Sequence, residues 1–385
     1  MYLGDGKLKI LVLPDSFKES LDSINVAKAI SRGLRKVNIA IEVESYPLSD
    51  GGEGFLDSVF QYMNLRKTNV KVTDLAWKRR KVAYGWCPDK RLAVIETARI
   101  VGLHLVPPQE RKPEKFTSYG VGEAIMKAVK KGAKEIVIGL GGSGVNDGGA
   151  GIAQALGYKL LDDRGEEVGW GPLNLLRVKK IVPPPGKSLL QNVSILIASD
   201  VKNPYYGKSG ATLVYGPQKG LAKELCPKVD RALRNFARVI KKDLGVDVQG
   251  QPGSGSAGGM GGALFAFAGG RFISGFEWIR KIANLDKRIL NADLVITGEG
   301  QLDYQTSFGK LVSEVVRFAS SYEKKIIVLV GRLGKGWEVI SRSKNVVVFP
   351  VSAGEFSREE LLKNCYSNLV RTAEQVGKFL MWQLF

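Results

Sequence analysis

The chain has 385 residues, of which 44% are apolar and 25% charged, and its formal net charge is +19. This length exceeds one ordinary hydrophobic core and predicts two domains. No stretch approaches about 18 consecutive apolar residues, which excludes a membrane-spanning helix. The three cysteines, Cys87, Cys226 and Cys365, are widely separated and form no zinc-type pair, which favours a reducing cytoplasm.

The positive charge is scattered along the chain. Basic runs are short, such as Lys78 to Lys81, whereas nucleic-acid-binding proteins usually cluster their basic residues. We therefore expect no nucleic-acid partner, and we interpret the excess as an aid to attracting small acidic substrates. His104 is the only histidine and lies between two leucines, so we expect a structural role for it. Hydrolases built on Ser–His–Asp or Cys–His groups are thereby disfavoured.

The N-terminal quarter predicts a doubly wound parallel sheet. A buried strand over 8–14 is followed by a polar loop and by helical spacing of apolar residues over 24–37. A second strand over 39–48, a second polar loop and a helix from about Phe55 to Met63 repeat the order. Strand, loop and helix in this alternation indicate βαβ units. Ligands of such sheets bind at the carboxyl ends of the strands, where both polar loops fall.

The middle of the chain has a different pattern. Short alternating strands are predicted from about Val70 to Glu96, then a helix from about Ser118 and a strand over 133–140. That strand leads into a glycine-rich loop from Gly139 to Gly151. Further along we expect a strand over 193–199, an amphipathic helix over 221–244, and a second glycine-rich stretch over 250–270 whose later half is helical.

The last hundred residues return to the first pattern. We expect a strand and loop over 292–300, a helix over 306–321, and buried strands over 324–331 and 345–352. Ser357 and Glu360 form a capping-box pattern that opens the final helix. Because the two ends resemble each other, we predict one domain from residues 1–88 plus 288–385. An inserted α/β domain would cover residues 89–287, with the active site in the cleft between the two.

The first glycine-rich loop resembles known phosphate cradles only weakly. Gly139, Gly141 and Gly144 spell the dinucleotide fingerprint after a strand, and Asp162 follows about twenty residues later. The last of these glycines, however, should open a helix, whereas here the loop continues. A P-loop is absent, because neither Gly-Lys-Ser sequence has the required upstream glycine. A dinucleotide-dependent oxidoreductase acting on a small hydroxy acid remains the alternative function.

Five loops at predicted strand ends combine small residues with charges. The polar members are Asp15, Ser16 and Lys18; Asp50 and Glu53; Asn146 and Asp147; Asp200 and Asn203; and Glu299, Asp303, Gln305 and Thr306. Any one acid could simply cap a helix or form a turn. Together, glycine backbone and lysine suit an anion, and several acids suit Mg²⁺ or a base for an alcohol proton. This combination favours phosphoryl transfer.

Seven motifs in this order resemble the bacterial-type glycerate kinase family: "PDSFKES", "DGGEG", "GGSGVNDGGAG", "SDVKNP", "GPQKG", "AGGMGGAL" and "ITGEGQLDYQTSFGK". The resemblance implies phosphorylation of D-glycerate with ATP and Mg²⁺. It also implies a Rossmann- or flavodoxin-like domain built from both chain ends, with a second α/β domain inserted and the active site between them. The 2-hydroxyl is the favoured acceptor, because this class is associated with 2-phosphoglycerate.

The chain departs from the family pattern in three motifs. Glu19 stands where the family usually has glycine, Gly144 and Val145 replace a commoner Ala-Thr pair, and Gln301 replaces an arginine. The last change removes one candidate partner for a phosphate or carboxylate. Glu96 and Glu123 match family positions, where a cap or core-edge role is equally expected.

We assign provisional roles on this basis. Lys18 is expected to bind the glycerate carboxylate or the transferring phosphoryl group, and Asp50 is the first choice as base. Asp147 is the second choice, with Asn146 orienting a hydroxyl. Substrate contacts are expected from Asp15, Ser16, Glu53, Asn146, Gln305 and Thr306. Phosphate contacts are expected from Gly141, Gly142, Ser143, Gly148, Gly298 and Gly300. Mg²⁺ is expected at Asp200, Glu299 or Asp303.

Besides the oxidoreductase, two alternatives stay open. A non-catalytic sensor would bind glycerate without turnover, and a nucleic-acid-binding protein would show salt-sensitive gel shifts. No heptad or self-complementary stripe indicates an oligomeric state, so a homo-oligomer is neither predicted nor excluded.

Overall fold

The computed structural model describes residues 7–37, 41–49, 51–186, 189–303, 311–352 and 357–382. The chain divides into two compact units. The first comprises residues 1–49, 57–63 and 276–385, and the second comprises residues 50–56 and 64–275. Both combine helices with mostly parallel strands, which confirms the predicted α/β class.

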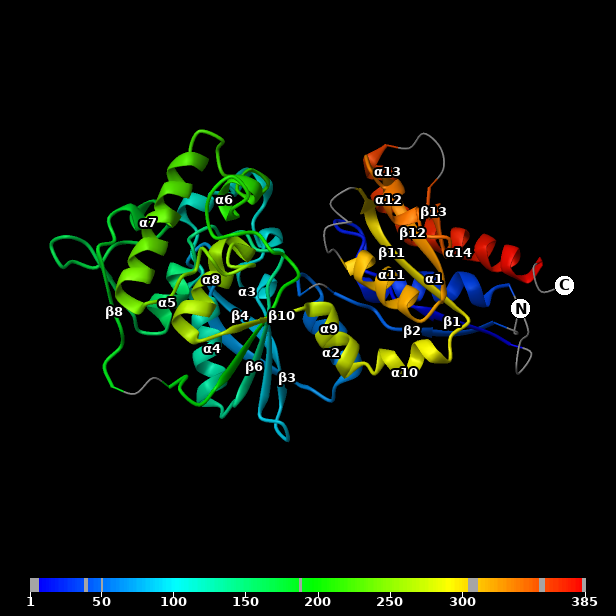
Figure 1. The fold of residues 1–385 in the computed structure, drawn as a ribbon, viewed down its shortest axis with the longest axis horizontal. Helices are drawn as coiled ribbons and strands as arrows, with labels where there is room; N and C mark the ends of the chain where they lie inside the picture. The colour runs from blue at the N-terminus through cyan, green and yellow to red at the C-terminus, as the bar shows by residue number, and fades with distance from the viewer. Residues whose placement is uncertain are drawn as a thin grey trace. The chain divides into compact units, whose positions relative to one another are not determined.

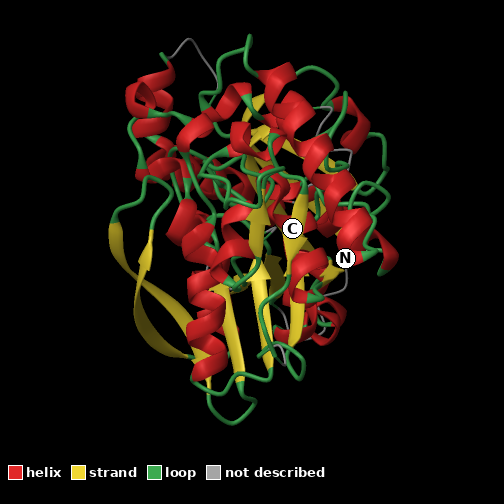
Figure 2. Ribbon diagram, turned by 90° about the vertical axis from the view of Figure 1, so that its left-hand side faces the viewer, coloured by secondary structure: helices red, strands yellow, loops and turns green. Residues whose placement is uncertain are grey.

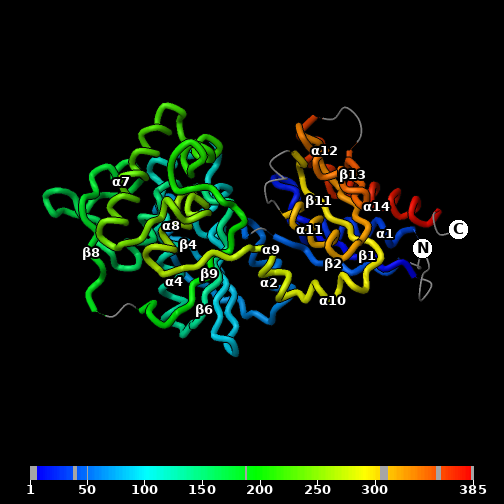
Figure 3. Tube along the Cα trace, viewed as in Figure 1, coloured from blue at the N-terminus to red at the C-terminus, as the bar shows by residue number. Residues whose placement is uncertain are grey.

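The first unit contains a five-stranded, wholly parallel sheet in the order β13-β12-β11-β1-β2. Its strands are β1 (Leu8–Val12), β2 (Ile41–Ser45), β11 (Leu294–Leu302), β12 (Lys325–Leu333) and β13 (Val346–Pro350). The two chain ends meet where Ile10 of β1 pairs with Leu294 of β11. Figures 1 and 3 show the blue β1 within the same sheet as the later, yellow to orange strands. Apolar side chains of β1, β11 and β12 form the core of this unit.

The helices of the first unit include α1 (Ser23–Arg35), which is capped by a side chain and packs closely on α14 (Cys365–Trp382). The others are most of α2 (Phe55–Tyr62), α9 (Gly275–Ile282), α10 (Leu285–Leu290), α11 (Leu311–Ser321), α12 (Glu338–Ser341) and α13 (Arg358–Lys363). Asp22 caps α1 by accepting a hydrogen bond from Asn25 N at 2.7 Å. Gly33 lets α1 approach α14 closely, because a Cβ there would lie 2.3 Å from Val370 O.

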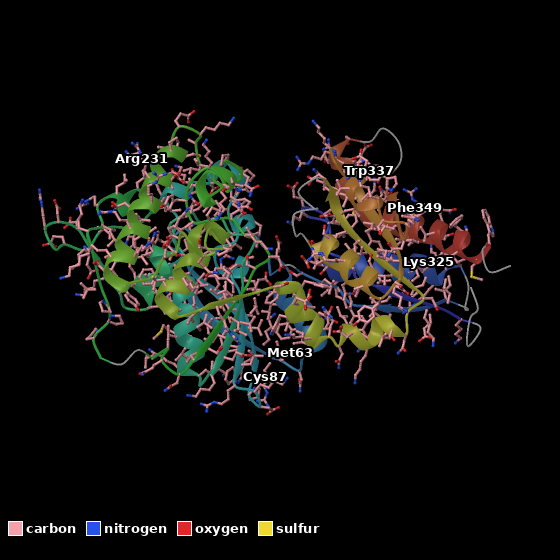
Figure 4. All side chains as sticks on the ribbon, viewed as in Figure 1. Met63, Cys87, Arg231, Lys325, Trp337 and Phe349 are labelled. Carbon is pink, nitrogen blue, oxygen red and sulfur yellow. The ribbon has the colours of Figure 1, made fainter. Side chains whose placement is uncertain are left out.

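The predicted capping box of Ser357 and Glu360 is confirmed. It opens the short helix α13, and a separate helix, α14, follows at Cys365, so the single predicted final helix is two helices. Figure 4 labels Lys325, the first residue of β12, and Phe349 of β13, which is partly buried against the core of this unit.

The second unit contains a six-stranded sheet in the order β10-β9-β6-β5-β4-β3, seen with yellow strands and red helices in Figure 2. Its strands are β3 (Arg66–Thr73), β4 (Arg79–Cys87), β5 (Leu92–Glu96), β6 (Glu135–Gly139), β9 (Ser194–Ala198) and β10 (Arg271–Ile273). Strands β5, β6, β9 and β10 are parallel to one another. Strand β4 is antiparallel to both of its neighbours, β3 and β5. A separate antiparallel pair joins β7 (Lys159–Leu161) to β8 (Lys180–Val182).

The helices of the second unit enclose a large apolar core. They are α3 (Ala98–Val101), α4 (Tyr119–Lys130), α5 (Ala150–Ala155), α6 (Ala211–Tyr215), α7 (Cys226–Leu244) and α8 (Ser256–Ala268). Short 3₁₀ turns are η1 (Leu103–Leu105), η2 (Pro108–Glu110), η3 (Pro113–Lys115), η4 (Pro172–Leu176) and η5 (Pro217–Lys219). The predicted helix over 221–244 begins five residues late, with Pro227 in its first turn, where proline fits.

The divisions between the units lie earlier in the chain than the predicted boundaries at residues 88/89 and 287/288. The hairpin of β3 and β4 joins the second unit because β4 pairs with β5. Phe276 belongs to the first unit, and its ring lies 5.8 Å from that of Phe318. Met63, labelled in Figure 4, is the last residue of the first unit before the chain enters the hairpin.

Two further features bear on the predicted environment. Cys87, Cys226 and Cys365 are free and buried. Within the described ranges, none of the helices combines the length and apolarity that crossing a bilayer requires.

Candidate functional site

The glycine-rich loop of the second unit lies at the carboxyl edge of its parallel strands. Because β5, β6, β9 and β10 run in one direction, the segments that follow them gather at one edge. Backbone hydrogen bonds join these segments: Thr97 N donates to Gly139 O at 3.1 Å, and Leu140 N donates to Ala198 O at 3.0 Å. This edge is where the sequence places Glu96, the loop from Gly139 to Gly151, and Asp200.

Asp147 is the centre of the loop. Its carboxylate accepts hydrogen bonds from Ser118 N at 2.8 Å, Ser118 Oγ at 2.9 Å, Gly149 N at 3.0 Å and Gly151 N at 3.3 Å. The residue is only 2% exposed. Burial raises the pKa of the Asp147 carboxyl, and the hydrogen bonds from Ser118, Gly149 and Gly151 oppose that rise. The four donors fix the path of the loop around this one carboxylate.

Lys219 is a buried cation that the sequence analysis did not single out. Its ammonium donates to Ser143 Oγ at 3.1 Å and to Val145 O at 2.7 Å, and the residue is 5% exposed. Burial lowers the pKa of Lys219 to about 7, while the charge of Asp147 acts in the opposite direction. The "GPQKG" motif, which places this lysine in a glycine-bounded turn after an apolar segment, was the feature of the sequence that could have pointed to Lys219. Lys219 therefore holds the loop at Ser143 and Val145, whereas Ser118 holds it at Asp147.

The neighbours of Asp147 are also held in place. Asn146 is fully buried and donates to Thr212 Oγ1 at 2.9 Å, while its Oδ1 has no hydrogen-bond partner. Tyr205 donates its hydroxyl to Gly148 O at 2.5 Å, and burial raises the pKa of that hydroxyl, as does the charge of Asp147. Here Asn146 serves the packing of the loop, and its predicted contact with a substrate hydroxyl stays a prediction.

Packing between loops explains several of the glycines. A Cβ on Gly141 would lie 2.4 Å from Gly52 Cα, and one on Gly148 would lie 2.5 Å from the Tyr205 hydroxyl. A Cβ on Gly258, in the second glycine-rich stretch, would lie 2.1 Å from Val145 O. Gly142 is exposed and Gly141 half-buried, whereas Ser143 to Gly151 are buried. Bare backbone in this loop thus serves close approach of other loops, and only Gly141 and Gly142 are open to solvent.

The structure does not form the dinucleotide fingerprint. The third glycine, Gly144, does not open a helix, because α5 starts only at Ala150. Asp162 is engaged elsewhere: it accepts from Arg164 N at 3.0 Å and from Glu166 N at 3.1 Å, and it pairs with Arg177 at 2.5 Å. The oxidoreductase alternative loses both of its sequence signals.

The turn over 51–56 is tied to the same edge through Glu96. This buried carboxylate accepts from Leu56 N at 2.9 Å, Gly54 N at 3.2 Å and Arg99 Nε at 3.3 Å. Burial raises the pKa of Glu96, and the Arg99 charge and the backbone donors oppose this. Glu53 points outward, with its side chain 68% exposed and 3.8 Å from His104 Nδ1. His104 lies on η1 and is half-exposed, as expected of a loop-edge residue.

A second group of predicted site residues lies in the first unit, at its topological switch point. From β1 the chain continues to β2 on one side, and β11 pairs with β1 on the other. Ligands of such sheets usually bind at the carboxyl ends of the strands on either side of this point. Asp15 N donates to Gly298 O at 2.9 Å, and Asp15 Oδ1 accepts from Ser16 N at 2.6 Å. A Cβ on Gly300 would lie 3.3 Å from Lys18 N. Asp15, Ser16 and Lys18 are therefore brought beside β11.

The "TGEG" segment was expected to be a phosphate-binding loop, but it is part of a strand. Strand β11 continues through it to Leu302, and Gly298 and Glu299 are in register with Leu329 and Val330 of β12. A Cβ on Gly298 would lie 2.2 Å from Leu329 O, so strand packing accounts for this glycine. Contacts of Gly298 and Gly300 with phosphate stay predictions.

One departure from the family pattern has a structural consequence. Glu19 has a φ of +69°, in the left-handed region that favours glycine, and it pairs with Arg358. The ion pair holds a residue in a conformation that glycine adopts at lower cost. Gln301, the other charge-changing departure, donates to Asp303 Oδ2 at 2.9 Å.

Asp200, Glu299 and Asp303 were predicted as alternative metal ligands, and which of them binds Mg²⁺ stays a prediction. Among the residues that the structure describes, no three Asp, Glu, His or Cys side chains gather as a metal site. Asp200 belongs to the second unit, where its Oδ1 accepts from Gly275 N at 3.1 Å, whereas Glu299 and Asp303 belong to the first. Mg²⁺ usually takes one or two protein carboxylates together with waters and phosphate oxygens, so these residues fit a cation that arrives with a nucleotide. Asp50, Gln305 and Thr306 lie outside the described residues.

The fold defines an α/β protein with polar groups at the carboxyl ends of parallel strands in both of its sheets. The glycerate kinase family model matches residues 10–381. The chain is 38% identical to a glycerate 2-kinase of Escherichia coli and 36% identical to a glycerate kinase of Halalkalibacterium halodurans, over 97% of this chain and 98% of each relative. It also resembles the crystal structure of a protein assigned as glycerate kinase 2 from Salmonella typhimurium LT2, with a TM-score of 0.80 and 40% identity, over 98% of this chain and 99% of that one.

The chain belongs to the glycerate kinase family. This confirms the resemblance carried by the seven motifs. The members of this family named above are kinases, and none of these findings supports the oxidoreductase alternative.

Proposed function

We propose that this chain transfers the γ-phosphoryl group of ATP to a hydroxyl of D-glycerate, with the 2-hydroxyl as the favoured acceptor. The observation that carries the proposal is the family match over residues 10–381, which includes all seven motifs. The name of the Escherichia coli relative, glycerate 2-kinase, supports the 2-position. Three free, buried cysteines suit a reducing compartment, and we propose a cytoplasmic location.

The acceptor must lose a proton while its carboxylate is neutralised. Lys18, beside β11, would bind the carboxylate or the transferring phosphoryl group. Asp50 stays our first candidate for the base. Asp147 is less suited to that role, because four donors already surround its carboxylate. Asp147 would instead hold the loop in the shape that binds a ligand.

ATP would meet the solvent-facing start of the glycine-rich loop. Gly142 is exposed and leaves room for an anion to approach the backbone, and Ser143 accepts a hydrogen bond from Lys219 Nζ. Bound Mg²⁺ would neutralise charge on the phosphates, and Asp200, Glu299 and Asp303 are the proposed protein ligands. Lys219 and Asp147 would keep this loop rigid, which lowers the reorganisation needed during transfer.

A coupled assay for ADP tests the proposal. The purified protein should release ADP only when ATP, Mg²⁺ and D-glycerate are all present. Asp50→Asn should lower turnover about 10²- to 10⁴-fold while ATP still binds, if Asp50 is the base. Near-normal turnover of that variant would move the role of base to Asp147, and ADP release independent of glycerate would remove the proposed function.

A further inference from the structure

The hairpin between β3 and β4 presents an aromatic side chain at the edge of the sheet that bears the glycine-rich loop. Its turn, Asp74 to Lys78, lies at the carboxyl end of β3, and β4 then runs antiparallel to β5. Because β5 is antiparallel to β4, this turn and the carboxyl end of β5 project to the same edge. Trp77 occupies the turn and is 37% exposed.

Trp77 is held in an unfavourable backbone conformation. Its φ is +65°, in the left-handed region that non-glycine residues adopt only at a cost in free energy. The turn is braced by Asp74, whose Oδ1 accepts from Ala76 N and Lys78 N, each at 2.9 Å. Bulky residues in this region tend to mark functional positions when the surrounding structure fixes them so firmly.

Two other rings complete the cluster. The Trp77 ring lies 4.1 Å from that of Trp170 and 5.8 Å from that of Tyr119, and the Trp170 and Tyr119 rings are 5.5 Å apart. Trp170 is 46% exposed and comes from a different loop. The three residues, Trp77, Tyr119 and Trp170, form what we call the aromatic platform. Part of the Trp77 side chain and part of the Trp170 side chain remain open to solvent, while the three rings support one another.

The platform is attached directly to the glycine-rich loop. Thr117 N donates to Leu75 O at 3.0 Å, and a Cβ on Gly144 would lie 2.8 Å from Leu75 Cδ1. Tyr119 is the first residue of α4 and follows Ser118, whose backbone and hydroxyl both hold Asp147. The hairpin of β3 and β4 is further fixed to α4 by Glu123, which accepts hydrogen bonds from Thr73 N at 2.6 Å and from Arg79 Nη1 at 2.7 Å.

We propose that the aromatic platform binds the purine base of the nucleotide substrate. This inference rests on the proposed function, which supplies a nucleotide whose phosphates lie at the neighbouring loop. A flat base gains by stacking on exposed aromatic faces, and rings that are already fixed lose little entropy on binding. The platform carries the base, while the start of the loop carries the phosphates.

The test compares ATP with inorganic tripolyphosphate, which has phosphates but no base, by titration calorimetry in the presence of Mg²⁺. The unmodified protein should bind ATP at least about tenfold more tightly than tripolyphosphate. Trp77→Ala and Trp170→Ala should each weaken ATP binding about 5- to 150-fold, the range of one stacked base, and leave tripolyphosphate unchanged. Trp77→Phe and Trp170→Phe, which keep a ring, should retain most of the affinity.

Trp382→Ala is the matched control, because Trp382 is 79% exposed on α14 of the first unit and should not affect ATP binding. Thermal unfolding of each variant reports its folding, and Trp170→Ala carries the test if Trp77→Ala does not fold. Equal loss of affinity for both ligands, or unchanged ATP binding, would overturn the proposal. A variant that alters only self-association in sedimentation would identify the platform as a surface for a second copy and would likewise overturn it.

The outcome is separable from that of the proposed function. If ATP binding depends on the base but glycerate is not phosphorylated, the proposal for the platform stands and the proposed kinase activity is refuted. If both Trp77→Ala and Trp170→Ala phosphorylate glycerate with an unchanged KM for ATP, the proposed kinase activity stands and the proposal for the platform is refuted.

Discussion

Replacing Lys219 by methionine removes a buried amino group while keeping a side chain of similar length. The folded protein holds the Lys219 amine away from solvent, so its pKa falls from 10.5 to about 7. Between these two values the unfolded chain binds a proton at this site that the folded chain does not. The stability of the unmodified protein therefore rises with pH over this window, and below pH 7 the cost of the buried charge is fully present.

The size of the effect follows from the difference in pKa. One unit corresponds to about 1.4 kcal/mol, so burying the charged amine costs up to about 5 kcal/mol below pH 7. From pH 7.5 to 9.5 this cost should shrink by about 2–3 kcal/mol. The methionine variant lacks this dependence, but it leaves Val145 O and Ser143 Oγ without their donor, at about 1–3 kcal/mol each.

Urea unfolding of both proteins at pH 7.5, 8.5 and 9.5 measures the difference directly. The advantage of the unmodified protein over Lys219→Met should grow by about 2–3 kcal/mol across the series, since the other titrating groups are shared. Lys208→Met, which removes an exposed lysine, is the control and should show a constant difference. A constant difference for Lys219→Met as well would refute the argument, because it would mean that the amine keeps its ordinary pKa.

Three further predictions concern folding. Asp147→Asn should lower the unfolding free energy by about 2–4 kcal/mol, because an amide cannot accept from all four donors; unchanged urea unfolding would contradict this. Gly258→Ala should destabilise the protein by at least about 2 kcal/mol more than Gly165→Ala in thermal unfolding. Both glycines have a positive φ, but only a Cβ at Gly258 would clash with Val145. Equal losses of stability would contradict this, because they would mean that the loop moves to relieve the clash. Ser357→Ala should cost about 1 kcal/mol through the lost cap and leave turnover unchanged; lost turnover would assign this residue a role beyond capping.

Much of the fold could be predicted because local pattern and topology agree. The buried strands at β1, β6, β9 and β12 are short apolar runs bounded by turn residues, and βαβ order makes them parallel. The domain boundary was harder, because alternation over residues 66–87 shows that strands exist but not which sheet they join. The pairing of β4 with β5 decides that, and it depends on contacts between segments that no local pattern reports.

The candidate site was predicted only in outline. Asp147 could be recognised in the sequence as the one carboxylate of the loop. Its four donors come from turns and from the start of a helix, and their approach cannot be seen in the sequence. Lys219 was missed because a lone lysine usually indicates an exposed residue, and only tertiary packing buries it. The glycines were interpreted as space for a ligand, yet Gly141, Gly148 and Gly258 make room for neighbouring loops.

The central claim is that glycerate itself receives the phosphoryl group, and phosphorus NMR of the reaction mixture tests it most directly. With ATP, Mg²⁺ and D-glycerate, we expect a new phosphomonoester resonance coupled to the hydrogen on carbon 2, growing in step with ADP. Inorganic phosphate as the only new phosphorus species would mean hydrolysis of ATP and would contradict the account.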